Sequence, residues 1–177
     1  MKDERKTTVW DVTTRFFHWL LVLAFCTSQL TAEEWDAAHE YSGYLILGFV
    51  AFRTIWGFVG PQNARFSNFV RTPSKIWAHF SNILTGRHIV QPSHNPAGGA
   101  MVLIMLLWFA LTGITGWLSI TLSGNVAELL ETFHEFLGEY SLILIALHVA
   151  AVIVMSLLER QDLAKSMIDG KKRLNRD

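Results

Sequence analysis

Four long apolar stretches, separated by polar segments, are the dominant pattern of this chain. They cover approximately residues 14–31, 39–59, 98–118 and 134–158. A helix needs about 20 apolar residues to cross a hydrocarbon core about 30 Å thick, so each stretch can span a membrane. The first stretch lacks the small-residue cleavage site of a signal peptide and three others follow it, so we expect it to be retained. The pattern predicts an all-α fold, a four-transmembrane-helix bundle that forms a single domain over residues 1–177.

Composition supports a membrane protein. Of the 177 residues, 51% are hydrophobic and 17% are charged, against about 25% charged residues in ordinary soluble domains. The formal net charge of zero argues against nucleic acid as a partner. The single cysteine, Cys26, excludes an internal disulfide and a cysteine-ligated cluster.

The positive charges are segregated along the chain, and this predicts the topology. All fifteen Lys and Arg residues lie within three segments, 1–15, 53–87 and 160–176. The two connections near residues 31–40 and 119–135 contain none. Under the positive-inside rule, both termini and the middle loop, about residues 60–97, are expected on the cytoplasmic side of the membrane.

A shorter helix is predicted within this cytoplasmic loop. In the sequence TPSKIWAHFSNILTG, Thr72 and Pro73 form a favourable N-cap and first-turn pair, and Gly86 marks the end. One face of the segment is apolar and consists of Ile76, Trp77, Phe80, Ile83 and Leu84. A short amphipathic helix of this kind is expected to lie on the inner membrane surface.

Four histidines lie near the ends of the predicted spans, in two pairs of matching depth. His134 and His148 are fourteen residues apart, which places them within about 40° on one helix face and about 21 Å apart along its axis. Because the helices alternate in direction, His18 and His148 lie at the inner level, and His39 and His134 at the outer level. Two imidazoles on facing helices can bind one metal from both sides, and bundle cores commonly hold such sites. This arrangement favours two stacked haems, each with two axial histidines.

A histidine in a membrane helix can also simply hydrogen-bond to a neighbour or lie at the interface. For any one of the four this reading is about as good as ligation, whereas two pairs of matched depth favour ligation. The other three histidines, His79, His88 and His94, lie in the polar loop, where solvated histidines are usual, and none is assigned as a ligand.

Two arginines lie near the inner histidine pair. Arg53 interrupts the apolar run LILGFVAFRTIWGF fourteen residues after His39, and a charge in such a run usually has a partner. A propionate of the inner haem is the expected counter-ion. Arg15, one turn before His18, has two readings of equal weight, a second propionate partner or a positive anchor at the inner surface.

Five glycines near the histidines allow either close helix packing or room for a flat macrocycle: Gly43, Gly48, Gly113, Gly116 and Gly138.

Seven motifs follow one another over almost the full chain: VWDVTTRFFHWLL, HEYSGY, FRTIWGFVG, ARFSNFV, HNPAGGAMVL, LTGITGWL and FHEFLGEYSLILIALHVAAV. With these motifs in this order, the chain resembles the bacterial cytochrome b561 family, which is related to the membrane cytochrome b subunits of nickel-iron hydrogenases. The resemblance implies four transmembrane helices, two b-type haems held by four histidines, and electron exchange with the quinone pool. Carried over motif by motif, the implied ligands are His18, His39, His134 and His148.

Two classes of function fit these features. The first is a di-haem b-type cytochrome that transfers electrons between membrane quinone and a periplasmic redox partner; if it is an enzyme, it is a quinol/quinone oxidoreductase. An iron with two axial protein ligands has no open position, which suits electron transfer. The second is a metal or proton transporter built on the same histidines. That reading needs acidic groups near mid-membrane, and the helix centres are nearly free of Asp and Glu.

The predicted outer surface is acidic, and this bears on the partner. It contains eight acids and no Lys or Arg: Glu33, Glu34, Asp36, Glu40, Glu128, Glu131, Glu135 and Glu139. Such a face attracts basic partners and repels anions. We therefore rank reduction of a basic c-type cytochrome above quinone-linked superoxide chemistry, which some relatives carry out. At the inner mouth of the third span, PSHNPAGGAM is either part of a quinone site or simply a helix start, and a homodimer is compatible with the pattern.

Overall fold

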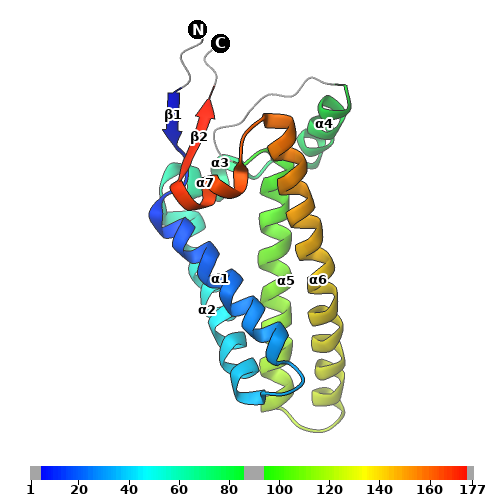
Figure 1. Ribbon diagram of the computed structural model, residues 1–177. Helices are drawn as coiled ribbons and strands as arrows, with labels where there is room; N and C mark the ends of the chain where they lie inside the picture. The colour runs from blue at the N-terminus through cyan, green and yellow to red at the C-terminus, as the bar shows by residue number, and fades with distance from the viewer. Residues whose placement is uncertain (1–4, 86–93, 175–177) are drawn as a thin grey trace. The chain divides into compact units, whose positions relative to one another are not determined.

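The computed structural model describes residues 5–85 and 94–174, and helices dominate this part of the chain (Figure 1). The elements in chain order are β1 (Arg5–Thr8), α1 (Val12–Thr31), α2 (Asp36–Val59), the 3-10 helix η1 (Gln62–Ala64), α3 (Phe66–Phe69), α4 (Pro73–Leu84), α5 (Pro96–Thr121), α6 (Asn125–Glu159), α7 (Leu163–Asp169) and β2 (Lys171–Leu174). The all-α class is confirmed, with one small sheet that the apolar pattern did not predict.

Three helices of the described chain are long and apolar enough to cross a membrane: α2, α5 and α6. The helix α1 has sufficient length, at 20 residues, but its Thr, Ser, Gln and His side chains make it less apolar than the other three. A membrane-spanning role for α1, and so the complete four-helix membrane bundle, stays a prediction.

The helices extend beyond the apolar stretches at the predicted outer side. The helix α6 begins at Asn125, nine residues before the predicted start at residue 134, and α2 begins at Asp36 rather than at residue 39. The added turns of α6 are amphipathic, so a search for apolar runs does not detect them. Gly124, with φ +71°, supplies the left-handed turn between α5 and α6. The predicted loop 119–135 is therefore wrong in length, because the connection comprises only residues 122–124.

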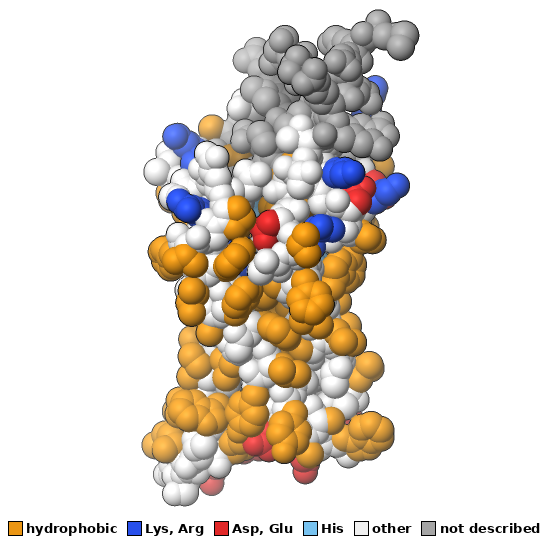
Figure 2. Space-filling model, turned by 90° about the vertical axis from the view of Figure 1, so that its left-hand side faces the viewer, with side chains coloured by type: hydrophobic (Ala, Val, Ile, Leu, Met, Phe, Trp, Pro, Cys, Tyr) orange, Lys and Arg blue, Asp and Glu red, His pale blue; other side chains and the backbone are white. Residues whose placement is uncertain are grey.

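The chain forms two compact units, each built from several segments. Unit 1 contains residues 1–16, 55–103 and 148–177. Unit 2 contains residues 17–54 and 104–147. The core of unit 2 is formed by α1, α2 and α5, with Ala24, Ile46, Val50 and Phe109 buried together. Many large apolar side chains of the helices remain exposed, and they cover much of the surface in Figure 2, as expected for helices that face lipid.

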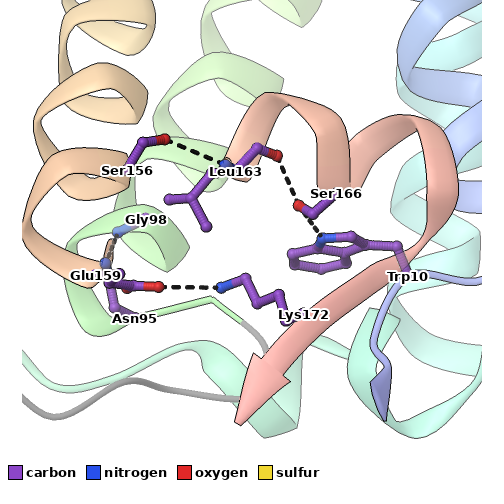
Figure 3. Close-up of polar contacts among 8 residues, drawn as sticks. All are labelled: Trp10, Asn95, Gly98, Ser156, Glu159, Leu163, Ser166 and Lys172. Atoms are coloured by element: carbon purple, nitrogen blue, oxygen red, sulfur yellow. Dashed lines mark hydrogen bonds and ion pairs between the residues drawn. The ribbon is translucent and has the colours of Figure 1, made fainter. Parts of the chain in front are cut away.

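In unit 1, the segments near the two chain ends join in a terminal clasp. The strands β1 and β2 pair antiparallel, with Arg5 opposite Leu174 and Thr8 opposite Lys171. The indole N–H of Trp10 donates to the Ser166 hydroxyl at 3.2 Å, and the Lys172 ammonium lies 3.8 Å from the Glu159 carboxylate (Figure 3). Both side chains of this ion pair are buried. Burial lowers the pKa of Lys172, and the attraction of Glu159 opposes that shift.

The helix predicted within the middle loop is confirmed as α4. It begins at Pro73 and ends at Leu84, close to the predicted limits. Thr72 occupies the N-cap position, but its hydroxyl makes no cap hydrogen bond and lies 3.0 Å from the Ser74 hydroxyl. The start of this helix therefore depends on Pro73, whose fixed φ suits a first helical position.

Candidate functional site

In unit 2, two of the four predicted ligand histidines face each other. His39 lies in the first turn of α2, and His134 lies in the third turn of α6. Their Nε2 atoms are 3.5 Å apart, and their ring centroids are 5.8 Å apart with an interplanar angle of 78°. The structure thus brings together the pair that the depth argument assigned to the outer level.

Backbone carbonyl groups orient both rings of this pair. The Nδ1 of His39 lies 2.9 Å from the carbonyl oxygen of Ser28 on α1, and the Nδ1 of His134 lies 2.9 Å from that of Thr112 on α5. A carbonyl oxygen can only accept, so each Nδ1 carries the proton. Each Nε2 is then the nitrogen with the free lone pair, which is the protonation state of a metal ligand.

The spacing of the two Nε2 atoms suits a metal that they share. Imidazole nitrogen binds a first-row metal at about 2.0 Å, so two opposed rings require about 4 Å between their nitrogens. The observed 3.5 Å is smaller by about 0.5 Å, a change within the range of side-chain adjustment.

Glycines flank the histidine pair and leave space beside it. Gly43 follows His39 by four residues and Gly138 follows His134 by four residues, so each glycine lies on the same helix face as its histidine. A Cβ at either position would meet no atom within 4 Å. This open space beside both histidines is what a flat macrocycle between them needs.

Two other glycines fit the close-packing reading of the two that the sequence allowed. A Cβ at Gly116 would lie 2.7 Å from the imidazole of His134, and one at Gly113 would lie 2.5 Å from the side chain of Leu47. These glycines therefore allow α5 to approach α6 and α2 closely, and they do not provide room for a cofactor.

Side chains from α1 and α5 hold α6 beside the pair. The indole N–H of Trp108 lies 3.0 Å from both the Leu137 carbonyl oxygen and the Ser141 hydroxyl. The amide of Gln29 donates to the carbonyl oxygen of Gly138 at 3.2 Å. These contacts lie within two turns of His134 and fix the rotation of α6 about its axis.

The other predicted site residues are distributed over both units. His18, on α1 in unit 2, is half-buried and stacks edge-to-face with Trp19 at 5.3 Å. His148, on α6 in unit 1, is also half-buried. Arg53 is buried on α2, with 4% of its surface exposed. Arg15 donates to the carbonyl oxygen of Ile168, a contact that fits the anchoring reading of this residue.

Of the three loop histidines, His94 packs against aromatic rings. The ring of His94 lies 4.7 Å from that of Trp10 and 4.5 Å from that of Phe69. His79 is half-buried on α4, and His88 lies outside the described residues. Asn95, in the candidate quinone segment, accepts from the Gly98 N–H at 2.7 Å and so caps α5 (Figure 3), which supports the helix-start reading.

The acidic residues of the predicted outer surface all belong to unit 2 and are all exposed. Arg53 is the only Lys or Arg in the segments of unit 2, and it lies fourteen residues along α2 from His39. Figure 2 shows acidic side chains at the lower end of the face it displays, beyond the apolar surface. The histidine pair is therefore close to a strongly acidic surface.

Sequence reasoning missed the backbone partners of the site. It identified the histidines and glycines, but not the carbonyl groups of Ser28 and Thr112, because every residue has a carbonyl group and no side-chain pattern marks it. The small and hydroxyl-bearing residues of α5 gave only an indirect indication that this helix lies against His134.

The donor set fits haem better than a bare metal ion. In residues 5–85 and 94–174, no group of three or more His, Cys, Asp or Glu side chains could hold a metal ion. Two oriented imidazoles alone leave most positions of a metal unfilled, whereas the porphyrin of haem brings four nitrogen ligands of its own. The oriented Nε2 pair and the open space beside Gly43 and Gly138 thus satisfy both requirements of a haem with two axial histidines.

Comparison with known proteins supports this interpretation. The family model described as prokaryotic cytochrome b561 matches residues 9–170 of the 177, a range that includes all four histidines. Searches of curated proteins and of solved structures gave no match. Since the match covers nearly the whole chain, the chain belongs to the prokaryotic cytochrome b561 family, and it is a membrane protein that binds haem b and transfers electrons.

Proposed function

We propose that this chain is a di-haem b-type cytochrome of the bacterial inner membrane that carries electrons between the quinone pool and a basic c-type cytochrome in the periplasm. The observation that carries the proposal is the His39–His134 pair, with both Nδ1 atoms held by backbone carbonyl groups and both Nε2 atoms turned toward each other. Family membership supports haem as the group that the pair holds.

Four histidines hold the two haems in this proposal. His39 and His134 bind the outer haem, and His18 and His148 bind the inner haem. The fourteen-residue spacing of His134 and His148 on the continuous helix α6 gives the two sites a separation of about 21 Å along that helix. Arg53, buried on α2, pairs with a propionate of the inner haem, and Arg15 is a second candidate for such a contact.

The chain orients and protects the haems, while the haem iron supplies the one-electron redox change. The carbonyl groups of Ser28 and Thr112 accept the Nδ1–H bonds of His39 and His134, which raises the basicity of the ligating nitrogens. Two histidines per iron leave no position for oxygen or water, and this restricts each site to electron transfer.

Topology follows from charge and helix number. With α1 as a fourth span, both termini and the loop 60–97 lie in the cytoplasm, and the acidic surface of unit 2 lies in the periplasm. Quinone, which dissolves in the membrane, exchanges electrons with the haems from the lipid phase. The segment around Asn95 is a candidate for part of the quinone site, although its capping contact with Gly98 explains it equally well as a helix start.

The acidic surface supports a basic periplasmic partner. Eight exposed acids close to the outer histidine pair attract a cytochrome with a lysine-rich haem edge and repel superoxide, which is an anion. At low ionic strength this steering changes the encounter rate by about 10-fold or more. At about 0.1 M salt the Debye length falls to about 10 Å, so the effect weakens.

Two measurements test this proposal. A pyridine haemochrome assay of the purified protein should give two haems b per chain, and quinol should reduce both. Electron transfer to a basic c-type cytochrome should then slow as salt rises, and the variant Glu33→Lys/Glu34→Lys should slow it at low salt. A preparation with no b-type haem would refute the proposal and favour a histidine-based metal or proton transporter. Fast reaction with superoxide, unaffected or hindered by added cytochrome, would favour a quinone-linked superoxide oxidoreductase instead.

A further inference from the structure

The helix α4 of unit 1 carries large apolar side chains that are exposed. Trp77 is 78% exposed and Phe80 is 48% exposed. They are three positions apart, so they lie within about 60° of each other on the helix, and Ile76 and Ile83 continue the same apolar face. Asn82 and Lys75 lie on the opposite face. An apolar face of this size requires a partner that accepts aromatic rings.

The neighbouring helix α3 fixes the level at which α4 begins. The ring of Phe66 occupies the space that a side chain at Gly57 would need, and the carbonyl oxygen of Phe69 lies 2.7 Å from where a Cβ of Gly99 would be. Gly57 is in the last turn of α2, and Gly99 is in the first turn of α5. Both of these helices are long and apolar enough to span a membrane, so α3 lies where two spans end. The helix α4 begins four residues after Phe69, at this boundary between lipid and water.

The charges near α4 are positive, which favours an anionic partner. No Asp or Glu occurs between Glu40 and Glu128, and the loop 60–97 contains four Lys and Arg residues. Three of them, Arg65, Arg71 and Lys75, lie in the described part of the loop and are exposed. An apolar face beside cations and without any acid is complementary to anionic lipid headgroups over a hydrocarbon layer.

We propose that α4 is an anionic phospholipid-binding helix, which inserts Trp77 and Phe80 into the membrane and places Arg71, just before the helix, among phosphate headgroups. Tryptophan prefers this interfacial depth because its ring is apolar and its N–H remains within reach of water. This inference does not depend on haem or on the electron carriers. It assigns a lipid-binding role to the middle loop, separate from the histidine sites.

Site-specific labelling of the full-length protein in lipid nanodiscs tests the proposal. In a Cys26→Ser background, an environment-sensitive fluorophore is attached at Phe80→Cys or, as the matched control, at Asn82→Cys on the opposite face of α4. The label at position 80 should be quenched by nitroxide-bearing lipid and protected from aqueous iodide. The label at position 82 should be quenched by aqueous iodide and should not be quenched by nitroxide-bearing lipid. Protection at position 80 should increase when phosphatidylglycerol is added to phosphatidylcholine.

Charge variants make the test specific. Each Lys or Arg near an anionic surface changes the bound fraction by about fivefold, so Arg71→Gln should lower the phosphatidylglycerol dependence of the label at position 80 by about that factor. Lys165→Gln, which removes one positive charge at an exposed site on α7, should leave it unchanged. If iodide reaches the label at position 80 in both lipid mixtures, the proposal is wrong and this face of α4 lies in water. Protection from iodide without quenching by nitroxide-bearing lipid would also refute the proposal, because a protein surface would then cover the face. Equal protection with and without phosphatidylglycerol, or equal effects of Arg71→Gln and Lys165→Gln, would refute the role of anionic lipid.

Discussion

Replacing Gly43 or Gly138 with alanine tests whether the space beside the histidine pair receives haem. Each glycine lies one helical turn after a histidine, on the same face. A Cβ at either position meets no atom of the chain within 4 Å. The polypeptide alone therefore accommodates alanine at both positions, and any loss that follows the substitution has to come from the cofactor.

The expected magnitude differs between the haem-free and haem-bound protein. In the haem-free protein, alanine should stabilise each helix by about 1 kcal/mol relative to glycine. If a macrocycle fills the space, the added methyl group overpacks it, at a cost of about 1–3 kcal/mol. Since about 1.4 kcal/mol is a factor of ten in affinity, haem binding at the outer site should weaken roughly 5- to 150-fold.

The assay follows the loss of haem to an excess of apomyoglobin, which binds haem tightly and has a distinct absorbance spectrum. Gly48→Ala is the matched control, because Gly48 is on the same helix as Gly43 and also has no atom within 4 Å of its Cβ position. It follows His39 by nine residues, which places it on the opposite face of α2. One of the two haems should leave Gly43→Ala and Gly138→Ala faster than it leaves wild type, and Gly48→Ala should behave as wild type.

A specific result would refute this reasoning. If Gly43→Ala and Gly138→Ala keep both haems as firmly as Gly48→Ala does, no macrocycle occupies the space beside the pair. The open space would then be a feature of helix packing, and the two facing histidines would need another explanation.

Three further variants test other parts of the molecule. His39→Ala should remove one haem per chain and leave the other redox-active, as measured by pyridine haemochrome and redox titration, whereas loss of both haems would contradict two independent sites. Arg53→Leu should lower the midpoint potential of the inner haem, because a positive charge favours the reduced iron; an interaction of about 1.4 kcal/mol corresponds to about 60 mV for one electron. An unchanged potential would leave Arg53 as a packing residue. Lys172→Met should destabilise the terminal clasp by about 3–5 kcal/mol, since it leaves the Glu159 carboxylate buried without this ion pair, and proteolysis should detect the opening. The double variant Lys172→Met/Glu159→Gln should recover most of the resistance, and failure to do so would contradict the role assigned to the ion pair.

Apolar runs and charge predicted much of the helical architecture. The cores of α2, α5 and α6 were identified because lipid requires continuous apolar side chains, and α4 was identified from its cap residues and apolar face. The outer turns of α6 and the pairing of β1 with β2 were not predicted. The outer turns of α6 are amphipathic, so they do not form a continuous apolar run. The strands β1 and β2 join residues that are more than 160 positions apart, so no local pattern marks their pairing.

The histidine side chains of the candidate site could be predicted from the sequence, but the backbone groups that orient them could not. The depth of His39 and His134 followed from helix direction, and their facing Nε2 atoms agree with that pairing. The roles of the carbonyl groups of Ser28 and Thr112 depend on how helices pack, and sequence alone does not determine this. The same holds for Gly116, whose contact with His134 distinguishes it from glycines that leave open space.

The terminal clasp can form only after most of the chain has been synthesised. The strand β2 is made more than 160 residues after its partner β1. At about 5–20 residues per second, β1 has to wait roughly 10–30 s before it can pair. During this interval Trp10 has neither Ser166 nor the Gly170 carbonyl group as a partner. The helices α2 and α5 are therefore made and can enter the membrane while β1 is still unpaired. The pairing of β1 with β2 comes late in folding.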